Sequence, residues 1–159
     1  MDSLKNVTGT WQGAYSYEPL DRMSKREPVP FTLILKQGWF GRFTGGVTED
    51  ADRGMPGTGA IDGYFSYPRI EFTKRMPVSY VRTVDGRKIS LRDFVIEEGQ
   101  LCEHDVPHRP IFYRGEFPDC NHAQGTWIIS AGPIPLGDGR IVKVAESKGS
   151  WSMEIAANE

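Results

Sequence analysis

The chain has 159 residues, of which 38% are hydrophobic, enough for one core and too few for two independent ones. Its 19 Lys and Arg side chains against 21 Asp and Glu give a net charge of -2, so no overall positive field attracts nucleic acid or acidic membranes. The 18 glycines and 11 prolines indicate many turns between short strands and exclude an all-helical fold. We therefore expect one all-β domain over residues 1–159.

Short segments of alternating polarity, separated by turn residues, follow one another along the whole chain. In the first of them, Trp11, Tyr15 and Tyr17 share one face while Thr10, Gln12 and Ser16 share the other, a period of two that is typical of a strand. A charged, proline-bounded loop follows at 18–30 and could hold a helical turn. The predicted strands are residues 7–17, 31–36, 40–47, 57–65, 69–74, 78–84, 87–96, 111–117, 125–129 and 149–155.

Turn chemistry between these segments favours hairpins. Asp85-Gly86 predicts a type I′ hairpin between 78–84 and 87–96, because both central residues of that turn need positive φ. We place further turns at 66–68, at Pro118-Asp119 and at Gly137-Asp138-Gly139.

About eight to ten strands joined by sequential hairpins predict a single antiparallel up-and-down β-barrel, of the lipocalin-like kind. Closure hides the strand edges, and an eight-strand barrel encloses room for side chains or for one small ligand. A β-sandwich is the competing architecture, since alternation alone does not separate the two.

The pattern Gly-x-Trp occurs three times, at Gly9-Thr10-Trp11, Gly125-Thr126-Trp127 and Gly149-Ser150-Trp151. In a strand the Gly and the Trp share a face, so each indole is expected to pack beside a position without a side chain. If the terminal strands pair, we expect Trp11 and Trp151 to meet and seal one end of the barrel. Trp127 fits equally well as a core residue or as the wall of a cavity.

Gly9-Thr10-Trp11 in a first strand resembles the calycin group, which includes the lipocalins, the fatty-acid-binding proteins and the avidins. A bacterial lipocalin-like family is the nearest description. The sequence departs from the group in lacking the later lipocalin motifs and, at 18–30, the two-helix insert of the fatty-acid-binding proteins. The resemblance implies a barrel that binds a small, largely apolar molecule without covalent attachment.

The residues themselves support the same function. The faces that carry the tryptophans are rich in aromatic rings with hydroxyl tips, which suits a ligand with an apolar body and one or two polar atoms. A fully packed interior without a cavity is the alternative. The expected ligand-binding residues are Tyr15, Tyr17, Phe31, Phe65, Phe72, Tyr113, Trp127 and Met153.

All histidines and cysteines lie between positions 102 and 122, and thiolate and imidazole are preferred zinc ligands. Their spacings match no known zinc motif, so we expect no metal and no other cofactor, and we keep the cluster as a weak candidate site. A Cys–His pair could also serve nucleophilic catalysis, although nothing selects one. The weak candidate ligands are Cys102, His104, His108, Cys120 and His122.

Charge is segregated locally despite the small net value. Residues 69–92 hold seven basic side chains against two acidic ones, whereas 97–105 are acidic. We interpret them as two solvated faces that pair within or between subunits. An anionic partner at the barrel mouth is the alternative.

We therefore expect a non-catalytic, cytoplasmic barrel whose partner is a small apolar or amphipathic ligand. The N-terminus lacks a secretory signal, the two cysteines suit free thiols, and no apolar run is long enough to span a membrane. Nucleic-acid binding and membrane insertion are not expected, and a homo-oligomer is possible. The alternatives are an isomerase or cyclase working inside the barrel, or an oligomeric interaction protein with a filled barrel.

Overall fold

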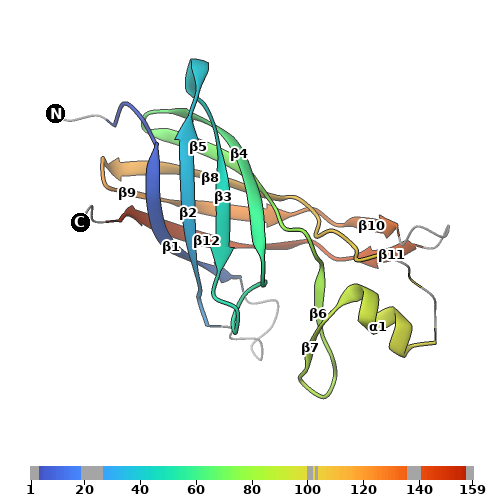
Figure 1. Ribbon diagram of the computed structural model, residues 1–159. Helices are drawn as coiled ribbons and strands as arrows, with labels where there is room; N and C mark the ends of the chain where they lie inside the picture. Colours follow the sequence, from blue (N-terminus) through green and yellow to red (C-terminus); the bar gives the residue numbers. More distant parts are fainter. Residues whose placement is uncertain (1–3, 19–26, 100–101, 103, 136–140, 157–159) are drawn as a thin grey trace.

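Eight antiparallel strands close into a barrel in the order β1, β12, β9, β8, β5, β4, β3 and β2 (Figure 1). The computed structural model describes residues 4–18, 27–99, 102, 104–135 and 141–156. The predicted fold class, an all-β antiparallel up-and-down barrel, is confirmed. The barrel strands are β1 (Gly9–Tyr17), β2 (Val29–Gln37), β3 (Arg42–Glu49), β4 (Thr58–Ser66), β5 (Arg69–Arg75), β8 (Ile111–Asp119), β9 (His122–Ile129) and β12 (Ser147–Ile155).

The period-two alternation of the sequence determines which side chains fill the barrel. In β2, Val29, Phe31, Leu33 and Leu35 are all buried, and the residues between them are exposed or half-buried. The same alternation around the barrel produces one continuous hydrophobic core inside it. The predicted turn at 66–68 is also confirmed, since β4 ends at Ser66 and β5 begins at Arg69.

The end of the barrel at which β1 begins, called the Trp11 end below, is sealed by apolar packing. Trp11 and Val7 are completely buried. The indole Nε1 of Trp11 donates a hydrogen bond to the Val7 carbonyl oxygen at 2.9 Å, and its ring meets that of Phe117 edge to face at 5.6 Å between centroids. The segment before β1 therefore acts as a plug.

Trp151 takes no part in this seal, so the expected meeting of Trp11 and Trp151 is wrong. β1 and β12 do pair and close the barrel, but Trp11 lies opposite Ile155, whereas Trp151 lies opposite Tyr15. The register thus separates the two indoles by four residues along the sheet, and Trp151 occupies the middle of the interior.

The segment between β5 and β8 leaves the barrel. It forms the two-stranded hairpin of β6 (Tyr80–Arg82) and β7 (Lys88–Ser90), followed by the helix α1 (Leu91–Glu97). The predicted strand over 87–96 is therefore wrong beyond Ser90, because the Ser90 hydroxyl accepts a hydrogen bond from the Asp93 N–H at 3.0 Å and caps a helix. Its buried residues Leu91 and Val95, four apart, lie on one helical face.

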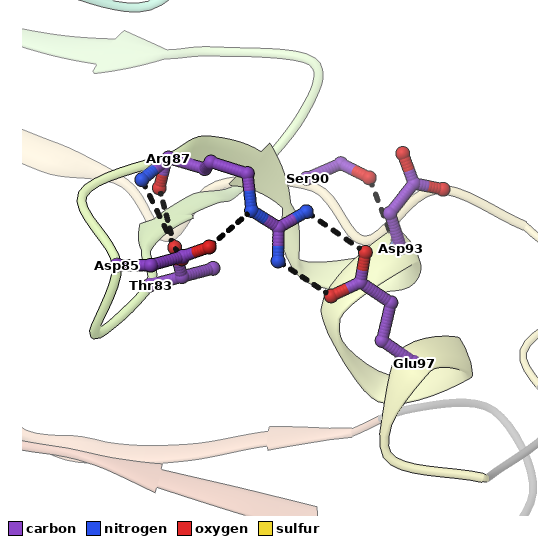
Figure 2. A network of polar contacts seen from close by, with 6 residues as sticks. All are labelled: Thr83, Asp85, Arg87, Ser90, Asp93 and Glu97. Carbon is purple, nitrogen blue, oxygen red and sulfur yellow. Dashed lines mark hydrogen bonds and ion pairs between the residues drawn. The ribbon is translucent and has the colours of Figure 1, made fainter.

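The hairpin and α1 are joined by charged side chains, as Figure 2 shows. The Arg87 guanidinium donates to Asp85 at 2.9 Å and, with two nitrogens, to both Glu97 carboxylate oxygens at 3.0 and 3.1 Å. Part of the basic segment thus pairs with the acidic one inside the same chain. The turn itself differs from the predicted type I′, because only Gly86 has positive φ there and Asp85 does not.

Two other turns differ from the expected positions. β3 begins at Arg42 instead of residue 40, because Trp39–Gly41 form a 3-10 turn (η1). The β8–β9 hairpin turns at Cys120-Asn121, after a bulge between Glu116 and Asp119, so that Gly115 pairs with Gly125 instead of His122.

The segment between β9 and β12 forms a second hairpin outside the barrel, β10 (Gly132–Pro135) with β11 (Ile141–Val144). The predicted turn at Gly137-Asp138-Gly139 and most of the predicted loop at 18–30 lie outside the described residues. No helix in the described part of the chain has the length and apolar character needed to cross a membrane.

Candidate functional site

The tryptophans of the interior lie over glycines of neighbouring strands. A Cβ added to Gly149 of β12 would lie 2.7 Å from the Trp127 ring of β9, and one added to Gly115 of β8 would lie 2.6 Å from the Trp151 ring. Each indole therefore fills space that a side chain would otherwise occupy. The pairing is across strands, whereas the sequence pattern pairs each Trp with the Gly two residues before it.

The expected ligand-binding residues all belong to this interior. Tyr15, Phe31, Phe65, Phe72, Tyr113, Trp127 and Met153 are at most 5% exposed, and the half-buried Tyr17 packs against them. Phe72 and Tyr113 stack with centroids 4.7 Å apart, and Tyr17 meets Trp127 edge to face at 5.0 Å. The rings contact one another, so the interior is an aromatic wall whose side chains largely fill it.

A charged pair lies within this aromatic wall, at the end of the barrel where β1 ends, called the Glu49 end below. The Lys74 Nζ donates to a Glu49 carboxylate oxygen at 2.6 Å, and the two side chains are 2% and 0% exposed. The other Glu49 oxygen accepts from the Tyr15 hydroxyl at 2.7 Å and from the Met55 N–H at 3.0 Å. The carboxylate is thus held by three donors from three parts of the chain.

The aromatic rings around the pair stabilise the ammonium group. Lys74 Nζ lies 4.4 Å from the Tyr15 ring centroid and 5.2 Å from that of Tyr113, within the range of cation–π attraction. Burial lowers the pKa of Lys74, against the attraction of Glu49. Burial and the Glu49 charge raise the pKa values of Tyr15 and Tyr113, so both phenols stay protonated and can donate hydrogen bonds.

Glu49 and Lys74 are the candidate functional residues that sequence reasoning missed. Glu49 was assigned to an acidic loop and Lys74 to a solvated basic face, and the structure shows that both assignments are wrong. The alternation contained the correct answer, because Lys74 follows Ile70 and Phe72 at intervals of two, and Glu49 follows Val47 in the same way. Their charge outweighed their position in our interpretation.

Residues 50–57, called the β3–β4 loop below, cover the Glu49 end. Their Met55 side chain is 9% exposed and joins the interior core. The loop is fastened twice, by the Met55 N–H bond to Glu49 at 3.0 Å and by Lys88 of β7, whose Nζ donates to the carbonyl oxygens of Ala51 and Gly54 at 2.7 and 2.6 Å. The excursion hairpin thus holds a cover over the charged pair.

We expect Lys88→Ala to loosen this cover without unfolding the barrel. Loss of two hydrogen bonds from a charged donor should raise the hydrogen-exchange rate of the Met55 amide about tenfold or more. Exchange of the β8 and β9 amides should stay unchanged. Lys5→Ala, at the other end of the barrel, is the matched control, and equal effects of the two variants would contradict the latch.

His108 lies beside the charged pair, on the segment that leads into β8. Its Nδ1 lies 2.7 Å from the Arg109 carbonyl oxygen, which only accepts, so this nitrogen carries the proton. Burial, together with the positive charge of Lys74, lowers the pKa of His108, although Arg109 and Glu49 act in the opposite direction. The neutral ring is therefore the form favoured by the fold.

This histidine predicts a loss of stability in mild acid. Below the ordinary pKa of about 6.5, the unfolded chain takes up the proton before the folded chain does, so the free energy of unfolding falls by up to about 1.4 kcal/mol per pH unit until the lowered pKa is reached. His108→Gln should flatten the denaturation curves over this window. An unchanged pH dependence in the variant would show that other groups cause it.

The histidines and cysteines do not assemble into one cluster. Cys102, His104 and His108 lie near the Glu49 end, whereas Cys120 and His122 lie at the β8–β9 turn of the Trp11 end. Both cysteines are free. Among the described residues, no three His, Cys, Asp or Glu side chains converge as metal ligands would, so the chain brings together none of the weak candidate sites.

The fold and the site define the class of this protein as a closed eight-strand antiparallel barrel, compatible with a calycin-like fold, with a charged pair buried in an aromatic interior. Comparison of the chain with protein-family models, with curated proteins and with solved structures gives no match.

Proposed function

We propose that this barrel is a lipocalin-like binding protein that takes up a small, largely apolar molecule bearing one or two polar atoms. The observation that carries the proposal is the Glu49–Lys74 pair, buried with Tyr15 and Tyr113 in an otherwise aromatic interior. The ligand's apolar body would contact the rings, and its polar atoms would exchange hydrogen bonds with this pair and the two phenols. No covalent step is involved.

The energetics of buried charges support a functional role for the pair. Removing two charges from water costs several kcal/mol for each ion, and apolar residues of similar volume often give equal or greater stability. A charged pair kept in such a place, beside groups with strongly shifted pKa values, is more typical of a binding site than of a packing element.

The β3–β4 loop gives the proposed ligand a route to the interior. The rings already contact one another, so binding requires side chains to move, and Met55 is the buried residue supplied by a loop instead of a strand. Opening this loop breaks the Met55 bond to Glu49 and frees one carboxylate acceptor site beside Tyr15. Loop opening and exposure of the polar groups are therefore coupled.

Competition binding tests the proposed recognition of a polar atom. The apolar fluorescent probe N-phenyl-1-naphthylamine should bind saturably to the wild type and be displaced by a long-chain alcohol and, more weakly, by the corresponding alkane. Tyr15→Phe keeps the ring but loses the hydroxyl bonded to Glu49, and we expect about tenfold weaker competition by the alcohol with no change for the alkane.

Tyr64→Phe is the matched control, because this tyrosine is 48% exposed on the outer face of β4. It should leave both competitors unaffected. Probe emission that rises without saturation in the wild type would contradict an interior site. An equal loss of affinity for alcohol and alkane in Tyr15→Phe would contradict the role of the hydroxyl.

A further inference from the structure

The hairpin between β2 and β3 carries two aromatic side chains on its tip, Gly38–Arg42. Trp39 is 84% exposed and Phe40 is 89% exposed. Figure 1 shows this tip projecting beyond the neighbouring strands at the Trp11 end. Large apolar side chains that stand together on a protrusion are unusual on a soluble surface and mark a contact site.

The tip is held in a defined conformation. The Gly38 N–H donates to the Arg42 carbonyl oxygen at 2.7 Å, and the Arg42 N–H donates back to the Trp39 carbonyl oxygen. Phe40 has φ 57° and ψ 35°, a left-handed conformation that side chains other than glycine seldom adopt. Gly41 touches β4 so closely that an added Cβ would lie 2.4 Å from the Phe65 carbonyl oxygen. The backbone thus presents both rings to solvent.

The charge around the tip is of one sign. The exposed Lys36 and Arg42 flank the two aromatic residues, and no acidic residue occurs anywhere from 31 to 48. Tryptophan and phenylalanine with adjacent cations are the composition of segments that lie in the interface of anionic membranes. The near-zero net charge of the chain conceals this local arrangement.

The size of the tip favours a bilayer over a protein partner. Two aromatic side chains bury roughly 150–250 Å² each, whereas a standard protein interface needs about 800 Å² from each partner. A lipid surface requires no complementary shape, so a small protrusion suffices. We propose that the β2–β3 tip docks on the surface of an anionic lipid bilayer, with Trp39 and Phe40 in the interfacial layer and Lys36 and Arg42 at the headgroups.

This inference stands independently of the proposed ligand. It replaces the expectation, drawn from the net charge and the lack of an apolar span, that the chain does not insert into membranes: two side chains enter the interface, and no segment needs to cross it. Three of the four tryptophans, Trp11, Trp127 and Trp151, are at most 3% exposed. The tryptophan emission that shifts on binding therefore reports Trp39.

The test uses vesicles of phosphatidylcholine alone and with about a third phosphatidylglycerol. We expect the wild type to co-sediment with the anionic vesicles, less so in high salt, with a blue shift of tryptophan emission. Lys36→Gln/Arg42→Gln should reduce the preference for anionic vesicles about tenfold. Trp39→Ser/Phe40→Ser should lower the partition coefficient by at least about tenfold with an unchanged near-UV circular dichroism spectrum outside the Trp39 contribution.

Val84→Ser is the matched control, since Val84 is a fully exposed apolar residue at the β6–β7 turn, and it should bind like the wild type. Wild-type binding no greater than that of Trp39→Ser/Phe40→Ser, or an emission maximum that does not move, would overturn the proposal. A concentration-dependent dimer lost in Trp39→Ser/Phe40→Ser, without vesicle binding by the wild type, would also overturn it and assign the tip to self-association.

Discussion

Replacing Lys74 by methionine is expected to lower the free energy of unfolding by about 3–5 kcal/mol. The substitution keeps most of the side-chain volume but leaves the Glu49 carboxylate, 0% exposed, without its cation. Tyr15 and the Met55 N–H still donate to it, but neutral donors do not replace a full positive charge. Urea denaturation followed by the emission of the buried tryptophans measures the loss.

Two further variants show whether the loss comes from the unpaired charge. Glu49→Gln combined with Lys74→Met removes both charges, so most of the stability should return and the double-mutant cycle should give a large coupling energy. Arg75→Met breaks the exposed ion pair of Arg75 with Asp62, 2.7 Å apart one residue further along β5, and should cost about 1 kcal/mol or less. Equal losses for Lys74→Met and Arg75→Met would contradict burial of the pair.

Trp151→Ala is expected to cost a similar amount, about 3–5 kcal/mol. Its indole fills the space above Gly115, meets Phe72 and Tyr113 edge to face at 5.6 and 5.9 Å, and donates from Nε1 to the Thr126 carbonyl oxygen at 3.0 Å. Truncation leaves a cavity in the middle of the barrel that backbone strands cannot collapse to fill. Thermal unfolding checks the size of the effect.

The matched control is Trp39→Ala, the same substitution at the 84% exposed tryptophan, which should change the stability by no more than about 0.5 kcal/mol. A loss below about 1 kcal/mol for Trp151→Ala would show that this ring is not part of the packed interior. If a cavity does form, the variant should also bind small aromatic molecules that the wild type excludes.

The barrel could be predicted from the sequence because its information is local. Alternation places Trp11, Phe31 and Phe72 on buried faces whatever their partners are. The helix α1 was missed although its signs were present, with Ser90 as cap and Leu91 and Val95 four apart. Seven residues after a hairpin were interpreted as the continuation of a strand, because the preceding turn suggested one.

The candidate site could be predicted only in part, because it depends on register. The interior aromatic residues were identified from their faces, but the cross-strand seating of Trp127 over Gly149 follows from the pairing of β9 with β12. Likewise, Glu49 and Lys74 come from β3 and β5, which are not neighbours in the sheet. No spacing within one strand can show that two such residues meet across the interior.

The stability and binding predictions meet in the variant Glu49→Gln/Lys74→Met. If the pair serves binding, this variant should fold about as well as the wild type and yet lose the polar contacts of the ligand. If the pair serves packing only, ligand binding and stability should respond together. The comparison therefore separates a role in recognition from a role in the core.

Native mass spectrometry of the full chain, purified without a tag and measured before and after denaturation, tests the central claim most directly. We predict a folded species heavier than the bare chain by one small molecule that denaturation releases, or, after delipidation, a saturable one-to-one mass shift with a member of a lipid and metabolite library. Both signals should be weaker in Glu49→Gln/Lys74→Met. A mass equal to that of the bare chain, with no saturable shift from the library, would contradict the account.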